Sequence, residues 1–247
     1  MPKVVAIVEA RMGSSRLPGK VLSDIFGKPA LERLIARLRL SKRIDEIIVA
    51  TTNSSKDDKL VAWLEGQEIN FFRGSEQDVL QRVVDTSREA NADVIVEING
   101  DCILTDYEII DEAIENFNKH NYDVVTNCGS ILSYPMGAYA QVFRSKDLEW
   151  VAKNISDSAV REHVSLFFYE NPDKYKIHDL VAPEEIRFPA WRLQLDYQED
   201  LKFLNAVYQR LYPIYGDAFT LYDIKDLLHK EPELLDINKH CVENAPR

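Results

Sequence analysis

The sequence is poor in cysteine, in glycine and in long apolar runs. Its 247 residues include three cysteines, nine glycines and ten prolines. The cysteines, Cys102, Cys128 and Cys241, are widely spaced and form no C-x-x-C pair. This spacing disfavours a disulfide framework or a zinc site and fits a reducing compartment. The low glycine and proline content excludes collagen-like and low-complexity chains.

Two further absences concern membranes and nucleic acids. No apolar run approaches the roughly 18 to 20 residues of a membrane span, and no charged-then-apolar leader precedes Val4. Lys and Arg number 30 against 41 Asp and Glu, so the net charge is −11. Affinity for a phosphate backbone comes from clustered cations, which so acidic a body lacks. We therefore expect a cytoplasmic protein that binds neither membrane nor nucleic acid, and whose basic loops hold a small anion.

The sequence does contain enough apolar material for a large core. Hydrophobic residues make up 45% and charged residues 29%. In the first half, short β-rich apolar runs alternate with segments of helical periodicity. Strands are predicted at Val4–Val8, Ile47–Ala50, Ile69–Phe72 and Val94–Ile98, and helices at Pro29–Leu40, Lys56–Leu64, from Val79 and at Tyr107–Phe117. The alternation predicts an α/β fold, a mostly parallel sheet covered on both faces, with ligands beyond the carboxyl ends of its strands.

This alternation of strands and helices ends after a fifth predicted strand at 123–128. Residues 129–190 mix a turn at Pro135-Met136-Gly137 with short strand and helix patterns, so we predict an inserted region that interrupts the sheet. A strand at Arg192–Asp196 follows, then helices at Asp200–Leu211, Leu221–His229 and Pro232–Lys239. Because no repeat, low-complexity tract or linker justifies a cut, we predict a single domain over 1–247.

The stretch from Ala10 to Lys20, directly after the first predicted strand, concentrates groups that bind anions. It holds three cations, two hydroxyls and two glycines: Arg11, Arg16, Lys20, Ser14, Ser15, Gly13 and Gly19. Glycine allows close backbone approach and unusual dihedrals, while hydroxyls and N–H groups donate to phosphate oxygens. Taken alone, the stretch could equally be a basic surface turn.

Two familiar phosphate-binding motifs are excluded for this stretch. Five residues rather than four separate Gly13 from Gly19, Pro18 lacks an N–H, and Val21 replaces the metal-binding hydroxyl of a P-loop. No G-x-G-x-x-G follows the strand either, which disfavours a dinucleotide-dependent oxidoreductase.

Two aspartates follow predicted strands. Asp101 comes after Asn99-Gly100 at the exit of the fourth strand, and Asp196 ends the later one. Mg²⁺ typically takes one or two protein carboxylates together with substrate phosphates and water. A turn or N-cap role is the alternative for Asp101 alone. Two such aspartates in a chain with an anion-binding loop favour a shared Mg²⁺ site.

The strand-to-helix turn at Arg73-Gly74-Ser75 is a further candidate. Ser75 is predicted to cap the following helix, with Asp78 completing an arrangement like a capping box. Arg73 and the exposed N–H groups of the turn could also hold a nucleotide's base or phosphate.

Together these motifs resemble a known family. Ala10-Arg11-x-Gly13-Ser14-Ser15-Arg16-Leu17-Pro18-Gly19-Lys20, Gly74-Ser75-x-x-Asp78-Val79-Leu80 and Gly100-Asp101-Cys102 resemble the cytidylyltransferases of the spore-coat polysaccharide type. These are relatives of 3-deoxy-manno-octulosonate and acylneuraminate cytidylyltransferases. Arg161-Glu162-His163-Val164 and the segment from Arg192 to Leu201 are similar to the same group. Two positions depart from the pattern: Ile103 replaces a usual proline, and Gln141 stands where an acidic residue is expected.

The resemblance implies a Rossmann-like nucleotidyltransferase of the nucleotide-diphospho-sugar transferase fold. It would use Mg²⁺ to transfer CMP from CTP to a sugar acid or related small acidic acceptor, releasing pyrophosphate, for surface polysaccharide or glycoconjugate biosynthesis. The catalytic residues would be Arg11, Lys20, Asp101 and Asp196, with both aspartates holding the metal. Nucleotide contacts would come from Ala10, Arg11, Gly13, Ser14, Arg16, Lys20, Arg73, Ser75 and Asn99, and acceptor contacts from Gln141, His163 and Arg192.

The resemblance also implies a homodimer, with residues 129–190 forming the dimer contact and the acceptor pocket. Alternatives remain at this point. The same fold could serve a uridylyl- or guanylyltransferase acting on a sugar phosphate, or a non-catalytic nucleotide-binding protein. His163, on a helix patterned by Val160, Val164 and Phe167, could be a packing residue rather than an acceptor or phosphate contact.

Overall fold

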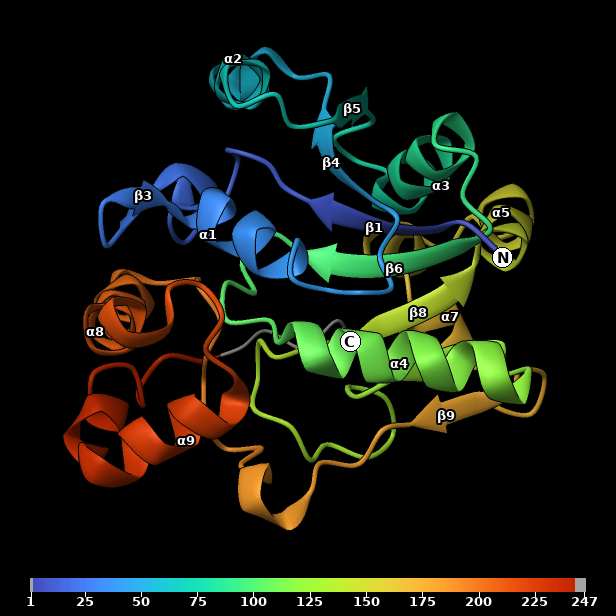
Figure 1. The fold of residues 1–247 in the computed structure, drawn as a ribbon. Coiled ribbons are helices and arrows are strands. Elements are labelled where there is room, and N and C mark those ends of the chain that lie inside the picture. The colour runs from blue at the N-terminus through green and yellow to red at the C-terminus, as the bar shows by residue number, and fades with distance from the viewer. Residues whose placement is uncertain (1, 243–247) are drawn as a thin grey trace.

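The structure, a computed structural model that describes residues 2–242, is built on a seven-stranded sheet (Figure 1). The strand order is β5-β4-β1-β6-β8-β7-β9. β8 runs antiparallel to β6 and β7, and the other neighbouring pairs are parallel. The bounds are β1 Val4–Glu9, β4 Glu46–Thr52, β5 Phe71–Gly74, β6 Val94–Asn99, β7 Val124–Thr126, β8 Gln141–Arg144 and β9 Ile177–Asp179.

Helices cover both faces of the sheet, because successive residues of its central strands point to opposite sides. Val4, Ala6 and Val8 of β1 enter one core, and Val5 and Ile7 enter the other. The first core packs under α1 Ala30–Leu38, α2 Asp58–Gly66, α4 Tyr107–His120, α8 Gln198–Tyr215 and α9 Leu221–Lys230. The second packs under α3 Val79–Glu89, α5 Ser145–Asn154, α6 Ser158–Glu162 and α7 Leu166–Tyr169. The predicted α/β architecture is confirmed.

Residues 129–190 leave the parallel order but return to the same sheet. β8 enters between β6 and β7, and β9 pairs with β7 at the edge. Between them α5, α6 and α7 pack against the sheet face that α3 also covers. The roles of this region in acceptor binding and dimer contact stay predictions.

The prediction of a strand at Arg192–Asp196 is wrong. The segment is extended but crosses the end of the sheet, where it meets loops instead of a neighbouring strand. Met136 and Arg192 form an isolated bridge, and the N–H of Leu195 donates to the carbonyl of Asp101 at 2.9 Å. These bonds still bring Asp196 beside the exit of β6.

Other boundaries also differ from the predictions. The helix predicted around Val160, Val164 and Phe167 is divided between α6 and α7. The region predicted as a helix at Pro232–Lys239 forms the 3₁₀ helix η4 Pro232–Asp236. The short pair β2 Asp24–Ile25 and β3 Lys28–Pro29 is a hairpin that the apolar pattern did not predict. Its turn uses Phe26 and Gly27 at φ 53° and 82°. The remaining 3₁₀ elements are η1 Lys20–Leu22, η2 Ser55–Asp57 and η3 Glu184–Ile186.

None of the helices within residues 2–242 combines the length and apolarity needed to cross a bilayer.

Candidate active site

A cavity of about 590 Å³ lies at the carboxyl ends of β1 and β6. Its walls are the loop after β1, the exit of β6, the start of α3 and the end of α6. Nine residues predicted for the site line it: Ala10, Arg11, Gly13, Ser14, Arg16, Lys20, Asn99, Asp101 and His163. A larger cavity of about 770 Å³ lies around Asp93 and Arg144, near the amino end of β6, and contains none of the predicted residues. The smaller cavity is therefore the candidate site.

Lys20 links the two predicted metal ligands. Its Nζ lies 2.5 Å from Oδ2 of Asp101 and 2.8 Å from Oδ1 of Asp196. Burial by itself would lower the pKa of Lys20, but the two carboxylates outweigh it, so the pKa is raised and the ammonium stays charged. The structure thus brings together two aspartates that are far apart in the sequence.

Asp196 is held firmly behind the cavity wall. Its side chain is 1% exposed, and Arg16 Nη2 contacts its Oδ1 at 2.8 Å. Arg192 donates from Nη2 to Oδ2 of Asp196 at 3.0 Å, and from Nε to Asp200 at 2.9 Å. Burial alone would raise the pKa of Asp196, but Lys20 and the two arginines hold it below its ordinary value. Arg192 itself does not line the cavity, so its position is that of a support for Asp196 rather than the predicted acceptor contact.

Two glycines shape the site. A Cβ added to Gly100 would lie 2.5 Å from the backbone oxygen of Glu9. The exit of β6 can therefore approach the end of β1 this closely only because residue 100 has no side chain. Gly19, which precedes η1, has φ 75° in the left-handed region. Gly13 has neither constraint, because its nearest neighbour would be 3.6 Å from an added Cβ.

The loop after β1 has donor groups beside the cavity that lack a partner. Among the described residues Arg11 has no ion-pair partner, and Nη1 of Arg16 is buried without a hydrogen bond. The loop itself is anchored, because the N–H of Met12 donates to Oδ1 of the buried Asp57 at 2.7 Å. Unpartnered guanidinium donors on a fixed loop suit an anion with several oxygens.

Arg73 and Ser75 lie outside the cavity lining. Arg73 donates to the backbone oxygens of Thr52 and Ser54, both at 2.9 Å, and pairs with Asp58 at 2.8 Å. These bonds stabilise the turn after β4, so this geometry does not support the predicted nucleotide contact. Ser75 is not the helix N-cap either. The cap of α3 is Asp78, whose carboxylate accepts from the N–H of Gln81.

Gln141 also lies away from the cavity. It is buried on β8, and its Oε1 accepts from the hydroxyl of Tyr169 at 2.5 Å. The geometry therefore does not support an acceptor contact from Gln141. His163, by contrast, lines the cavity as the residue that ends α6, and its N–H donates to the carbonyl of Ala159 at 2.8 Å.

Charged residues that the motif analysis missed also line the cavity. Arg82 and Glu9 face it from α3 and β1, and Glu162 lies beside His163. The carboxyl groups of Glu9 and Glu97 interact, and each has one buried oxygen without a hydrogen-bond partner. Burial raises the pKa of Glu9 to about 7 and that of Glu97 well above its ordinary value. The sequence contains a signal for two of these charged residues, because Arg82 and Glu97 interrupt apolar patterns that otherwise predict buried faces.

A Rossmann-like sheet with a cation-rich loop and paired aspartates at its carboxyl edge defines the class as a nucleotidyltransferase. Comparison with known proteins gives the family, since the cytidylyltransferase family model matches residues 5–221. An uncharacterised protein of Methanocaldococcus jannaschii is 37% identical over 99% of this chain and 98% of its own. The Bacillus subtilis spore coat polysaccharide biosynthesis protein SpsF is 34% identical over 85% of this chain and 88% of its own.

Comparison with solved structures gives the same family. A cytidylyltransferase from Leptospira borgpetersenii superposes with a TM-score of 0.88 at 28% identity and covers 99% of this chain and 100% of its own. A CMP:2-keto-3-deoxy-manno-octonic acid synthetase complexed with CTP shares the fold, with a TM-score of 0.63 at 17% identity over 84% of this chain and 99% of its own. The chain belongs to the cytidylyltransferase family and is a CTP-dependent nucleotidyltransferase.

Proposed function

We propose that the chain uses Mg²⁺ to transfer CMP from CTP to a sugar acid or a related small acidic acceptor, for surface polysaccharide or glycoconjugate biosynthesis. The observation that carries the proposal is the convergence of Asp101 and Asp196 on Lys20 beside a cavity lined by cations. Two relatives support the proposal by their names, the first the polysaccharide role and the second the acceptor class. One is the spore coat polysaccharide biosynthesis protein, and the other is a 3-deoxy-manno-octulosonate cytidylyltransferase of Geobacter metallireducens, 32% identical over 45% of this chain and 43% of its own.

The donor set fits Mg²⁺. Asp101 and Asp196 each reach the same ammonium, so oxygens of both carboxylates lie close to one point. Two hard oxygen ligands that leave room for phosphate oxygens and water are what this ion prefers. In the structure the ammonium of Lys20 supplies the positive charge between the two carboxylates. When a triphosphate binds, its oxygens would offer that ammonium other partners. When bound, Mg²⁺ neutralises negative charge on phosphate oxygens.

The chain's own residues would orient the substrates and neutralise charge. An oxygen of the acceptor hydroxyl bonds to the α-phosphorus while the bond to the bridging oxygen of pyrophosphate breaks, and the hydroxyl proton passes to solvent. Arg11, Arg16 and Lys20 face the charge that accumulates on the leaving pyrophosphate. Positioning and electrostatic stabilisation carry most of the rate in such transfers. His163, on the far wall, is the proposed acceptor contact.

A pyrophosphate-release assay tests this proposal. The purified chain is incubated with Mg²⁺, with CTP, UTP, GTP or ATP, and with a panel of sugar acids and phosphorylated acceptors. We expect release with CTP and an acidic acceptor, and a higher melting temperature with CTP than with the other nucleotides, since a ligand of the native state stabilises it. Faster release from UTP or GTP with a sugar phosphate would replace the proposal with the rival activity. Absence of both turnover and CTP binding would refute it.

Two substitutions assign the roles within the site. Lys20→Ala should weaken CTP binding and slow turnover together, whereas Asp196→Asn should reduce Mg²⁺-supported turnover by about 10² or more, the usual order for loss of a group that stabilises the transition state. Lys28→Ala is the matched control, because Lys28 pairs with Glu32 on the surface, away from the cavity. Steady-state constants equal to wild type for either site variant would contradict the assignment.

A further inference from the structure

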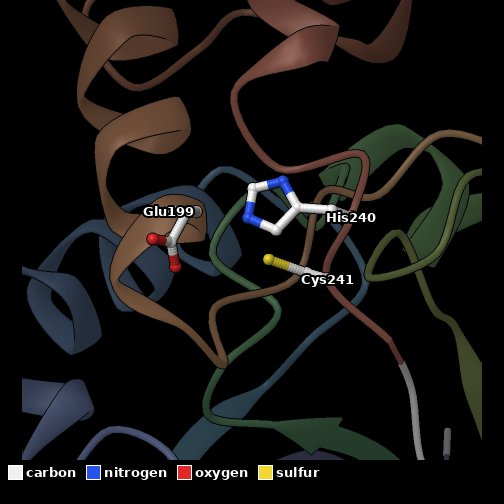
Figure 2. A group of neighbouring side chains, drawn as sticks. All are labelled: Glu199, His240 and Cys241. Atoms are coloured by element: carbon white, nitrogen blue, oxygen red, sulfur yellow. The ribbon is translucent and has the colours of Figure 1, made fainter.

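Three side chains of different chemistry meet where the last described residues pack against the start of α8. They are the carboxylate of Glu199, the imidazole of His240 and the thiol of Cys241, whose candidate ligand atoms all lie within 4.8 Å of one another. Figure 2 shows Glu199 on the first turn of a helix and His240 and Cys241 on one loop, with the imidazole and the thiol extending toward the side on which Glu199 lies. Cysteine spacing disfavoured a zinc site, but the fold adds a histidine and a carboxylate that the spacing of cysteines does not reveal.

The backbone that carries two of these groups is held in place without an ion. Asn238 is buried, and its side-chain amide donates to Oδ1 of Asp200 at 2.9 Å. The N–H of Cys241 donates to the carbonyl of Asn238 at 3.0 Å. One residue further on, the hydroxyl of Tyr197 donates to the carbonyl of Val242 at 3.1 Å. The segment is therefore docked on α8 at both ends, which limits the reorganisation that ligand binding would cost.

The three groups are free to act as ligands. Within residues 2–242, the side chains of Glu199 and His240 make no hydrogen bond or ion pair, and Cys241 is in no disulfide. Burial raises the pKa of the Cys241 thiol, and the nearby charge of Asp200 raises it further. A divalent ion that binds the thiolate takes the place of the thiol proton, so binding releases a proton.

The mixture of donors selects the kind of ion. Thiolate sulfur, imidazole nitrogen and carboxylate oxygen are the ligands of Zn²⁺, whereas Mg²⁺ prefers oxygen alone. We propose that Glu199, His240 and Cys241 bind a zinc-class divalent cation, with a fourth position left to water, and that the ion fastens residues 237–242 to α8. This site shares no ligand with the Asp101 and Asp196 pair.

Co²⁺ titration of the full chain, freed of metal with a chelator and kept in excess Mg²⁺, tests the proposal. We expect one equivalent to bind and to give the near-ultraviolet absorption of a thiolate bound to Co²⁺, and Zn²⁺ to displace it and raise the melting temperature. Cys241→Ser should lose the band, and His240→Ala and Glu199→Gln should weaken binding. Asp101→Asn should keep the band, which separates this site from the predicted Mg²⁺ site.

Matched controls are Cys128→Ser and His120→Ala, which remove a thiol and an exposed imidazole outside the cluster. Both should bind Co²⁺ as wild type does. A thiolate band that persists in Cys241→Ser, or the absence of any such band in a wild-type chain that is folded by circular dichroism, would overturn the proposal. Should Cys241→Ser not fold, the band of His240→Ala decides: undiminished affinity there also overturns it.

Discussion

At the scale of single residues, the pair Glu9 and Glu97 is the least expected feature of the site. Glu97 is 5% exposed and lies on β6, next to the β1 strand that carries Glu9. Two neighbouring buried carboxyl groups cannot both ionise cheaply, so burial and mutual repulsion favour a bound proton. Arg82 and Arg11 oppose this for Glu9, whose pKa nevertheless rises to about 7.

We predict that this pair makes the protein lose stability as the pH rises. The pKa of Glu9 is 4.5 in its ordinary state and about 7 in the fold, so between these values the native state binds more protons than the unfolded state. The free energy of unfolding must then fall with pH through that window. In Glu9→Gln the free energy of unfolding should fall less steeply with pH. Urea unfolding of the variant and of wild type between pH 5 and 8 measures this difference. An identical pH profile for the variant and wild type would contradict the role of Glu9.

Sequence reasoning at the residue scale brought residues to one cavity where a motif was local. The loop cations and Asp101 line the cavity because they follow strands, and the strand exits of a parallel sheet lie at one edge. Their roles in binding and catalysis stay predictions. Arg73 was misplaced because its position at a strand exit looks the same whether its guanidinium points to a ligand or, as here, to the backbone oxygens of Thr52 and Ser54. Glu9 was missed because a carboxyl that keeps a proton depends on neighbours from other strands.

At the scale of elements, the loop after β1 depends on the turn that follows β4. Asp57 is buried in η2, where it accepts from the N–H of Met12 with one oxygen and from the hydroxyl of Thr52 with the other. This contact ties the anion-binding loop to the neighbouring strand and fixes its shape before any ligand arrives.

Asp57→Ala should therefore weaken CTP binding although Asp57 does not line the cavity. The change leaves the N–H of Met12 and the hydroxyl of Thr52 without their acceptor, which costs about 1–3 kcal/mol of stability for each group that stays buried and unpaired. Urea unfolding measures that loss, and calorimetric titration measures the affinity for CTP. Asp58→Ala is the control, because Asp58 is exposed and forms an ion pair with Arg73 rather than a contact with the loop after β1. Equal CTP affinity in Asp57→Ala and wild type would show that the anchor is not needed.

The elements themselves were predictable to different degrees. The βα units of the first half follow from local periodicity, because each strand and helix buries its own apolar face. The segment 192–196 alternates like a strand, yet a strand needs a neighbour to pair with, and here the carbonyls of Met136 and Asp101 take its N–H groups. The two-residue strands of the hairpin at 24–29 are too short to leave a periodic pattern.

At the scale of the whole molecule, an exposed apolar area on residues 129–190 supports the predicted homodimer. Ile131, Leu132 and Val181 are 46%, 68% and 48% exposed. Their segments lie together, because the N–H of Ala182 donates to the hydroxyl of Ser133 at 2.9 Å. Contiguous exposed apolar side chains of this kind mark association surfaces more often than isolated ones do.

Sedimentation equilibrium at micromolar concentration should give twice the mass of one chain. Leu132→Asp should shift the distribution to the single-chain mass, because a charge buried in the interface is costly. Ile214→Asp provides the comparison, since Ile214 is 70% exposed on α8 and lies outside this region. If wild type sediments as one chain, residues 129–190 do not form the predicted dimer contact.

The contact between Lys20 and Asp196 spans 176 residues of chain. During synthesis the ribosome releases the amino-terminal strands first, so the anion-binding loop can fold while its second carboxylate is still unmade. A contact between residues so far apart in the sequence forms slowly and late in folding. A nascent chain that ends just before residue 196 would therefore already contain the seven described strands of the sheet and the cations of the loop after β1, yet lack the second carboxylate that contacts Lys20. If Asp196 is needed for turnover as proposed, catalytic competence can appear only after residue 196 has been synthesised and has reached Lys20.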